Sequence, residues 1–263
     1  MQIVSIGSSS SGNSYIIRTG NKAMVLDAGL SCIKITKALE ELGLRTDDVS
    51  AILITHEHGD HVKSVRTLAK KCPSANVYAS RGTVDSCDVF DAIEDERIVL
   101  LQAGEEATES DVIIRAFALS HDATEPIGYS VIADGEKLSI VTDTGRVTDE
   151  IFEEILDASM LVLEANHDEH LLMYGEYPYH LKQRIKSDEG HLSNRAAGEL
   201  LAELLEGRQS PLPVMLAHLS FHNNAPFRAR ASIEEILEEA GFTRDEHYTL
   251  TIAAKDEMTF FGE

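Results

Sequence analysis

The sequence predicts an α/β protein in which two β-sheets are sandwiched between helices. Short runs rich in Val and Ile alternate along the chain with longer stretches whose apolar residues recur at helical spacing. Strands come first, helices are interspersed, and more strands and helices follow, which favours this layered arrangement. The sequence has no repeat, low-complexity tail or Pro/Gly-rich linker, so we expect a single domain over residues 1–263.

The individual elements follow from the same two patterns. The expected strands are bounded by Gly, Asp and Ser, and they cover residues 2–6, 14–18, 23–27, 51–55, 76–79, 112–118, 129–133, 138–142, 160–164, 213–217 and 248–253. The expected helices cover residues 32–42, 62–71, 148–157, 194–206 and 230–240. Several helix ends have matching capping residues: Ser31, Thr148 and Ser193 at N-caps, and Gly43, Gly207 and Gly241 just past C-terminal ends.

Charge and hydropathy limit the classes of function. The formal net charge of −22 should repel polyanions at long range, which argues against non-specific coating of nucleic acid. A local cationic site around bound metal ions remains compatible with that charge. The sequence contains no stretch of 18 or more apolar residues, so it predicts no membrane span. Residues 1–7 lack the features of a signal peptide. We therefore expect a cytoplasmic protein with no membrane association, and no obligate protein partner can be read from the sequence.

The cysteine pattern argues against disulfides and against a Cys-rich zinc site. The three cysteines, Cys32, Cys72 and Cys87, are odd in number and form no C-x-x-C pair. We expect reduced thiols that pack as small apolar side chains.

Polar residues follow the buried runs at the places where chemistry is expected. The polar residues at these strand ends are Asp27, His56, His121, Asp143 and His218. Because strand ends on a rigid sheet converge on one edge, the sequence predicts a functional site there. Taken singly, His121 or His218 is as readily a structural histidine, and Asp143 a turn or capping residue.

The densest local signal is the segment 55–61, Thr-His-Glu-His-Gly-Asp-His. Its spacing, H-x-H-x-D-H, puts four potential ligands within six residues: His56, His58, Asp60 and His61. Imidazole and carboxylate donors suit zinc, manganese or iron. We expect a strand end, a tight turn at Gly59 and a helix start, a geometry that suits two adjacent ions better than one. The competing interpretation is a polar surface loop with incidental histidines.

This motif and the order of the other polar residues resemble the metallo-β-lactamase superfamily, and the resemblance covers essentially the whole chain. It implies the metallo-β-lactamase fold, a four-layer αββα sandwich of two mixed sheets flanked by helices. It also implies that two divalent metal ions are bound, with Asp27 orienting a ligand rather than binding metal. The implied ligands are His56, His58 and His121 for one ion, Asp60, His61 and His218 for the other, and Asp143 for both.

Motifs in both halves of the chain look like those of the YycJ (WalJ) group, relatives of RNase Z and RNase J. These motifs are 8–14, 120–126, 164–168, 190–194 and 218–224. The resemblance implies cleavage of nucleic-acid phosphodiesters, in particular 5′→3′ exonuclease action on DNA by a hydroxide that bridges two metal ions. There is no room for the large cap domain of RNase J, and the long Gly/Pro-rich arm of RNase Z is not visible. Flavodiiron oxidoreductases usually have Glu where this chain has His58, which weighs against redox chemistry.

Further residues are predicted to assist catalysis or bind substrate. Asp60 is expected to act in catalysis as well as in metal binding. His191, which we expect to open a helix, and His167 are candidates to bind phosphate or to protonate the leaving group, and structural histidines otherwise. Ser10 and Asn13 belong to a serine-rich turn that can present N–H groups and hydroxyls to a phosphate. The remaining predicted substrate contacts are Asn166, Lys182 and Arg184, the last two in the densest cationic stretch.

Two other classes of function remain open. One is a small-molecule hydrolase that acts on a cyclic-nucleotide or phosphonate phosphodiester, a thioester or a lactam, and the negative charge favours it. The other is a metal-dependent binding or regulatory protein, which the complete ligand set disfavours.

Overall fold

The computed structural model describes residues 1–262, and these divide into two compact units. Unit 1 comprises residues 1–118, 123–136 and the chain from residue 254 onward. Unit 2 comprises residues 119–122 and 137–253. The expectation of a single domain over 1–263 stays a prediction. No helix of residues 1–262 has the length and apolar character that a membrane crossing requires.

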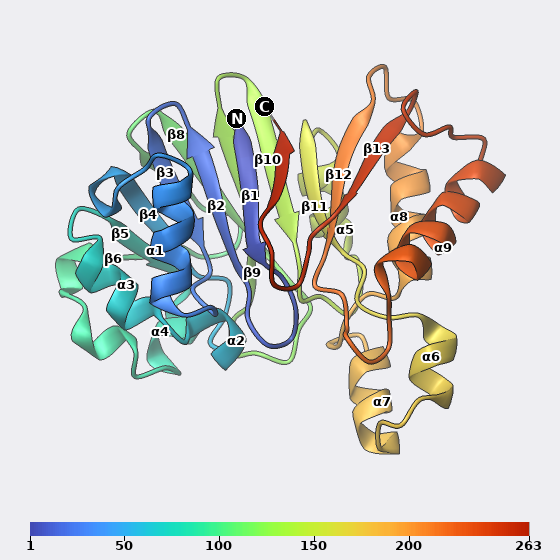
Figure 1. Cartoon of the computed structure of the whole chain (residues 1–263), viewed down its shortest axis with the longest axis horizontal. Coiled ribbons are helices and arrows are strands. Elements are labelled where there is room, and N and C mark those ends of the chain that lie inside the picture. The colour runs from blue at the N-terminus through green and yellow to red at the C-terminus, as the bar shows by residue number, and fades with distance from the viewer. Residues whose placement is uncertain (263) are drawn as a thin grey trace. The chain divides into compact units, whose positions relative to one another are not determined.

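Unit 1 contains a mixed sheet with the strand order β14-β1-β2-β3-β4-β5-β6 (Figure 1). Pairing is antiparallel from β14 to β3 and parallel from β3 to β6. The strands are β1 (Gln2–Gly7), β2 (Ser14–Thr19), β3 (Lys22–Leu26), β4 (Val49–Leu53), β5 (Asn76–Ala79), β6 (Ile98–Leu100) and β14 (Thr259–Gly262). The helices are α1 (Cys32–Glu41), α2 (Gly59–Val62), α3 (Val65–Lys71) and α4 (Arg81–Asp85), beside 3-10 turns at Thr46–Asp48, Phe90–Ala92 and Asp95–Arg97.

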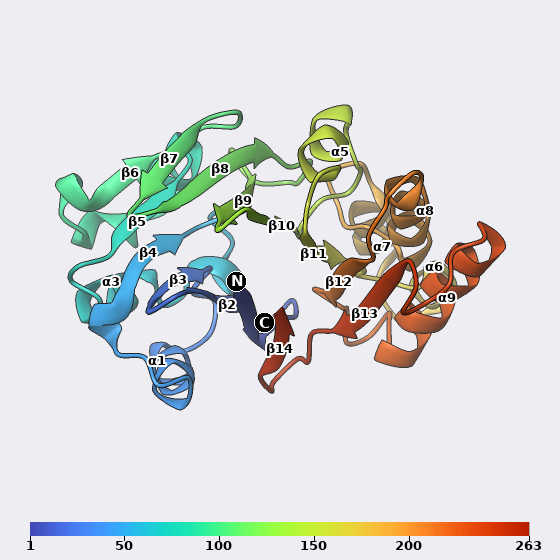
Figure 2. The same cartoon turned by 90° about the horizontal axis from the view of Figure 1, so that it is seen from above.

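Three further strands of unit 1 face this sheet. They are β7 (Glu106–Glu109), β8 (Val112–Ala118) and β9 (Ile127–Ala133), paired antiparallel in that order. The buried Tyr129 hydroxyl donates to the Ile54 carbonyl at 2.9 Å, which joins the two layers. Helices α1 and α3 lie on the opposite face of the first sheet, so unit 1 stacks helices, sheet and sheet (Figure 2).

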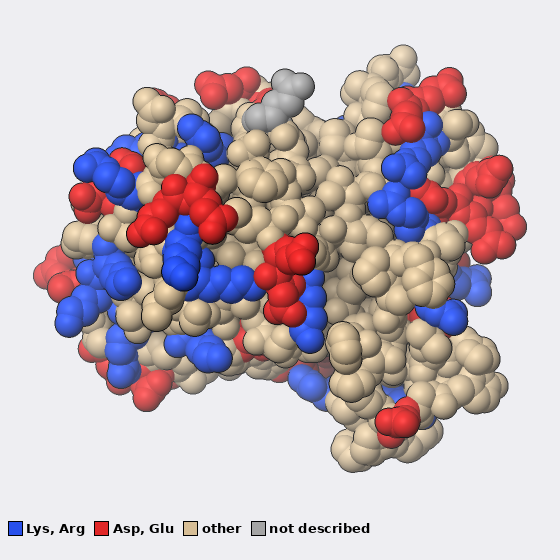
Figure 3. All heavy atoms as spheres, in the orientation of Figure 1, with Lys and Arg blue, Asp and Glu red and all other residues tan. Residues whose placement is uncertain are grey.

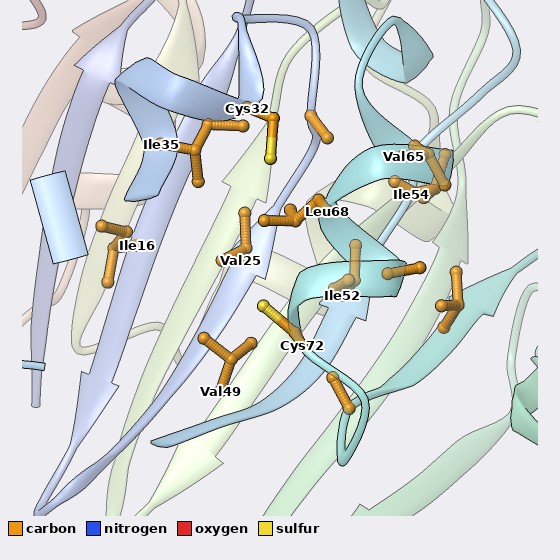
Figure 4. Close-up of a cluster of buried hydrophobic side chains, with 14 of the residues drawn as sticks. Ile16, Val25, Cys32, Ile35, Val49, Ile52, Ile54, Val65, Leu68 and Cys72 are labelled. Atoms are coloured by element: carbon orange, nitrogen blue, oxygen red, sulfur yellow. The ribbon is translucent and has the colours of Figure 1, made fainter. Parts of the chain in front are cut away.

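The core of unit 1 lies between its helices and the first sheet. Ile35 of α1 and Leu68 of α3 point onto Val25 and Ile52 of the sheet, and all four side chains are inaccessible to solvent (Figure 4). Burial of such side chains is the main favourable contribution to folding, roughly 1.5–3 kcal/mol for each. The helices thereby hold the strand ends in fixed positions.

The cysteines pack as the sequence predicts. Cys32 and Cys72 are buried in the same core, and Cys87 is half-buried at its rim. Burial raises the pKa of the Cys72 thiol to about 12, so this thiol stays protonated and unreactive at neutral pH.

Unit 2 contains the parallel strands of the second mixed sheet, in the order β13-β12-β11-β10. The strands are β10 (Glu136–Val141), whose first residue belongs to unit 1, β11 (Met160–Glu164), β12 (Leu212–Ala217) and β13 (Tyr248–Ile252). The helices are α5 (Asp149–Ile155), α6 (Glu169–Tyr174), α7 (Tyr179–Lys186), α8 (Asn194–Leu205) and α9 (Pro226–Glu239). Helices α8 and α9 pack closely because Gly198 leaves room for Ile236, whose Cδ1 would lie 2.8 Å from an added Cβ.

The predicted capping residues are confirmed. The side chains of Ser31, Thr148 and Ser193 each accept the backbone N–H three residues later. Each of the three predicted glycines adopts a left-handed φ, between 72° and 88°, just past a helix.

Several predicted boundaries are wrong. The helix expected over 62–71 is divided into α2 and α3, because the Ser64 N–H bonds to the Ala28 carbonyl instead of continuing the helix. The helix expected over 230–240 begins four residues earlier, at Pro226. Proline fits the first turn of a helix because a backbone N–H there would have no hydrogen-bond acceptor within the helix. The prediction missed six strands and α-helices: β6, β7, β14, α4, α6 and α7.

Candidate active site

The first group of potential ligands lies in unit 1, between β4 and α2. We call His56, His58, Asp60 and His61 the unit 1 donor set. The centroid of the His56 ring lies 4.6 Å from the centroid of the His58 ring and 4.1 Å from that of the His61 ring. His56 and His61 are buried. The predicted tight turn at Gly59 is wrong, because Gly59 is already the first residue of α2 and His58 is its N-cap. The short helix instead brings His61 back toward His56, with Asp60 Oδ2 3.6 Å from His61 Nε2.

Asp27 orients one histidine of this donor set, His61. Its buried carboxylate accepts the Nδ1–H of His61 at 2.8 Å, the Thr55 N–H at 3.0 Å and the Thr55 hydroxyl. The contact fixes the tautomer of His61, so that Nε2 carries the lone pair. Asp27 adopts a φ of 55°, a conformation that is uncommon outside glycine and persists where the surroundings determine it. These contacts support the role predicted for Asp27, orienting a ligand.

The serine-rich turn packs against the same donor set. The Asn13 N–H donates to the Asp60 carbonyl at 2.8 Å, and its side-chain Nδ2 lies 3.1 Å from Nε2 of His61. Asn13 is buried, whereas Ser10 is exposed at the tip of the turn. Asn13 therefore lies beside the potential ligands, and its role in substrate binding stays a prediction, as does that of Ser10.

The second group of potential ligands lies in unit 2. We call it the unit 2 donor set, and it consists of His121, Asp143, Glu164, His191 and His218. Ligand atoms of the last four lie within 4.8 Å of one another. Asp143 Oδ1 is 3.3 Å from His218 Nδ1 and 3.9 Å from His121 Nε2. Asp143 lies two residues after the end of β10 and His218 directly follows β12, with φ values of 62° and 55°, a local strain that is typical of functional positions.

Glu164 is the residue that the sequence analysis did not assign. This fully buried carboxylate, the last residue of β11, accepts the Nδ1–H of His191 and that of His218, each at 2.8 Å. Its other oxygen accepts the backbone N–H groups of Thr144 and Leu192 at 3.1 and 3.2 Å. Burial raises the pKa of Glu164, but the two histidines lower it by more, so the net pKa lies below the usual value and the group is ionised.

His121 is oriented by a backbone carbonyl. Its Nδ1 lies 3.0 Å from the Gly190 oxygen, a contact in which Nδ1 donates and Nε2 is left to accept. Burial lowers the pKa of His121, which favours the neutral imidazole that a metal ion requires. An added Cβ at Gly190 would lie 2.2 Å from the Ile185 carbonyl, so only glycine fits where this carbonyl is presented.

The two other catalytic candidates differ in exposure. The His191 side chain is 16% exposed. The prediction that His191 opens a helix is wrong, because α8 begins at Asn194 and its N-cap is Ser193. His167 is buried, burial lowers its pKa to about 4, and within residues 1–262 no side chain or backbone group bonds to its Nδ1. His167 is therefore neutral at physiological pH.

The remaining predicted substrate contacts have structural partners. Asn166 is buried and donates to the His218 carbonyl at 2.9 Å, so it fixes the loop that carries this potential ligand. In α7, the Lys182 ammonium donates to the Met173 and Gly175 carbonyls at 2.9 and 2.7 Å. Arg184 is exposed and pairs with Asp122. Their contacts with substrate stay predictions.

The donors of both sets suit a divalent metal ion. Three of the imidazoles are held through Nδ1 by an acceptor: Asp27 for His61, the Gly190 carbonyl for His121 and Glu164 for His218. Metal-binding histidines almost always donate their second ring N–H in this way, which leaves Nε2 as the ligand atom. A mixture of imidazole and carboxylate donors fits zinc, manganese and iron alike.

Comparisons with known proteins agree with these features. A family model described as the beta-lactamase superfamily domain matches residues 23–212. The chain is 38% identical over 239 residues to exodeoxyribonuclease YycJ of Bacillus anthracis, covering 90% of this chain and 89% of that protein. It is 37% identical over 238 residues to exodeoxyribonuclease WalJ of Streptococcus pneumoniae, covering 89% and 87%.

A solved structure shows the fold. The metallo-β-lactamase fold protein YhfI of Bacillus subtilis superposes with a TM-score of 0.72 at 16% identity, covering 98% of each chain. The predicted fold class, an α/β protein with two mixed sheets flanked by helices, is confirmed. The chain belongs to the β-lactamase superfamily and, within it, to the family of the YycJ and WalJ exodeoxyribonucleases.

Proposed function

We propose that this chain is a cytoplasmic, metal-dependent DNA exonuclease that hydrolyses phosphodiester bonds in the 5′→3′ direction. The observation that carries the proposal is the set of imidazoles anchored through Nδ1 in both donor sets, which leaves their Nε2 atoms as ligands. The choice of DNA is supported by the two exodeoxyribonuclease relatives, which align with this chain over about nine-tenths of its length.

We infer that the two donor sets together hold two divalent ions within one catalytic domain. The assignment is the one that family membership supports. His56, His58 and His121 bind one ion, Asp60, His61 and His218 bind the other, and Asp143 binds both. Zinc and manganese fit these donors equally well, and iron fits them too.

When bound, divalent ions acidify a water molecule and neutralise charge on phosphoryl oxygens. The chain's own residues orient the ligands and handle protons. Because Glu164 accepts the Nδ1–H of His191, a proton that His191 gives to the leaving oxygen comes from Nε2. His191 and His218 lower the pKa of Glu164, and its other oxygen accepts the N–H groups of Thr144 and Leu192, so His191 has a fixed, ionised carboxylate as its partner.

The negative charge of the chain favours a second candidate, a hydrolase of small phosphodiesters. A net charge of −22 works against binding of an extended polyanion everywhere except close to bound cations. Binding limited to the end of a DNA strand, where few phosphates contact the protein, is compatible with that charge. Exonuclease action is therefore the form of nuclease activity that this surface permits.

End-labelled DNA tests the proposal against this second candidate. We expect purified protein with added manganese or zinc to shorten 3′-labelled single strands progressively, to release the label of 5′-labelled strands in the first step, and to lose both activities after treatment with EDTA. Release of mononucleotides from the 5′ end first is the result expected for the proposed direction. The same preparation is tested on bis-(p-nitrophenyl) phosphate. Intact DNA beside rapid hydrolysis of this small phosphodiester would contradict the exonuclease proposal and favour the small-molecule hydrolase.

A further inference from the structure

Asn13, in the serine-rich turn of unit 1, reaches two of the potential metal ligands with its side chain. Its Nδ2 atom lies 3.1 Å from Nε2 of His61 and 3.4 Å from Oδ2 of Asp60. Those two ligand atoms are 3.6 Å apart, so a single amide nitrogen faces both of them. The proposed function gives both atoms to the same metal ion, and Asn13 is therefore placed to act on the ligands of that ion.

The orientation of the Asn13 amide follows from contacts within its own turn. Its Oδ1 accepts the backbone N–H of Ser9 at 3.0 Å, and its Nδ2 donates to the Ser9 carbonyl at 3.1 Å. A flipped amide would set its nitrogen against the Ser9 N–H and its oxygen against the Ser9 carbonyl, so the hydrogen-bond pattern assigns the two atoms. One hydrogen of the NH₂ group is used within the turn, and the other is left for Asp60 and His61.

Backbone contacts hold Asn13 and Asp60 in a fixed relation. The Asn13 N–H donates to the Asp60 carbonyl at 2.8 Å, and the Gly29 N–H donates to the Asn13 carbonyl at 2.9 Å. An added Cβ at Gly29 would lie 1.5 Å from the Asp60 carbonyl oxygen, so only glycine fits where these segments cross. Asn13 is buried, whereas the Asp60 side chain is 24% exposed. A partly exposed carboxylate samples several rotamers unless a fixed donor holds it, and the Asn13 amide is such a donor.

Asp60 and His61 differ in what they can do with this amide hydrogen. Because Asp27 accepts the Nδ1–H of His61, Nε2 of that ring carries one lone pair and no hydrogen. The lone pair can accept the Asn13 N–H or bind a metal ion, but it cannot do both. A carboxylate has lone pairs on two oxygens, so Asp60 can bind a cation and accept an N–H at the same time. Metal binding therefore leaves the amide hydrogen to Asp60.

We propose that Asn13 is a positioning residue whose amide hydrogen bond shifts from His61 to Asp60 when a metal ion binds. The hydrogen bond to Asp60 is charge-assisted, and it holds the carboxylate in the orientation in which it ligates the ion. This inference rests on the proposed function, because it uses the ligands assigned there. It adds a residue of the serine-rich turn to the support of the metal centre, a role that requires no contact with substrate.

Titration calorimetry with zinc tests the proposal on the unmodified protein and on Asn13→Ala. We expect Asn13→Ala to weaken one zinc equivalent by roughly 10- to 100-fold and to leave the other within about 2-fold. The substitution alters no formal charge, and Lys and Arg side chains lie among Asp and Glu side chains over the face of unit 1 that Figure 3 shows. A change in affinity therefore reports the lost hydrogen bond rather than a change in the field of the surface.

Asn76→Ala is the matched control. Asn76 is a half-buried asparagine of β5 in the same unit, and its Nδ2 also donates to a carboxylate, that of Glu109, at 2.9 Å. We expect both zinc equivalents to keep their affinity in this variant, because the lost hydrogen bond does not involve a potential ligand.

A second measurement uses the unmodified protein, so it does not depend on the folding of a variant. Nuclear magnetic resonance detects a scalar coupling between two nitrogens that share a hydrogen bond. We expect such a coupling between Nδ2 of Asn13 and Nε2 of His61 in the protein treated with EDTA, and we expect zinc to abolish it. An asparagine that only stabilised its own turn would give no coupling that zinc removes.

Three results would overturn the inference: equal weakening of both zinc equivalents in Asn13→Ala, unchanged affinity for both, or a coupling to His61 that persists when zinc is bound. Neither measurement depends on cleavage of DNA. A zinc equivalent that depends on Asn13, in a protein that leaves DNA intact, would contradict the exonuclease proposal and leave this inference in place. Cleavage of DNA by a protein whose zinc affinity does not depend on Asn13 would do the reverse.

Discussion

Replacement of Asp143 by Asn is expected to abolish hydrolysis of both DNA and bis-(p-nitrophenyl) phosphate, a loss of roughly 10³-fold or more in kcat/KM. Asp143 is buried, and its Oδ1 lies 3.3 Å from His218 and 3.8 Å from His191 in the unit 2 donor set. A neutral amide cannot supply the negative charge of a ligand shared by two cations. Asn is chosen because it tolerates the φ of 62° at this position and keeps the shape of the side chain.

A second variant at the same position separates lost chemistry from lost backbone geometry. Asp143→Ala removes the carboxylate as well, and its left-handed backbone adds roughly 1 kcal/mol of strain. The matched control is Asp149→Ala, an exposed carboxylate at the start of α5. We expect both Asp143 variants to be inactive and the control to keep full activity. An Asp143→Asn protein that hydrolyses either substrate at the normal rate would remove Asp143 from the site.

Replacement of Glu164 by Gln is expected to lower metal affinity by about 10- to 100-fold. The carboxylate accepts two histidine N–H groups and two backbone N–H groups. A glutamine side chain has one acceptor oxygen, and its NH₂ group would face donors on the other side. At least one imidazole must then rotate or change tautomer, and the free energy of unfolding should fall by roughly 1–3 kcal/mol for each buried donor left without an acceptor.

Competition with a chromogenic chelator measures the metal affinity, and urea unfolding of the metal-free protein measures the stability. Glu153→Gln, an exposed residue of α5, is the control for a general effect of lost charge. The two readouts separate a positioning role from a purely structural one, because a structural residue would lower stability without altering the affinity of the protein that remains folded. Unchanged metal affinity in Glu164→Gln would show that the carboxylate does not position the ligands.

The parts of the fold that the sequence predicts are those with strong local signals. Three N-caps and three C-terminal glycines are confirmed because each satisfies a backbone requirement within a few residues. The missed strands have weak local signals. For example, β7 has the sequence Glu-Ala-Thr-Glu, which is poor in strand-forming residues, and it forms because Ser110, with a φ of 57°, turns the chain so that β7 pairs with β8.

The candidate site shows the same limit. The motif at 56–61 and the polar residues after strands could be found because ligand spacing and strand ends are visible in the sequence. Glu164 also ends a strand, but the signal that distinguishes it is its contacts with His191 and His218, 27 and 54 residues away. The sequence likewise presents Lys182 as a free cation, whereas its ammonium binds two carbonyls that lie 7 and 9 residues away along the chain. Such partners depend on tertiary packing, which no local pattern encodes.

The central proposal is that the seven predicted ligands bind one pair of divalent ions, and anomalous diffraction from crystals of the manganese- or zinc-loaded protein tests it most directly. We predict two peaks about 3.5–4 Å apart. One should be ligated by His56, His58 and His121, the other by Asp60, His61 and His218, with Asp143 in contact with both. A single peak, or separate ions held by each unit alone with Asp143 in contact with only one of them, would contradict the account.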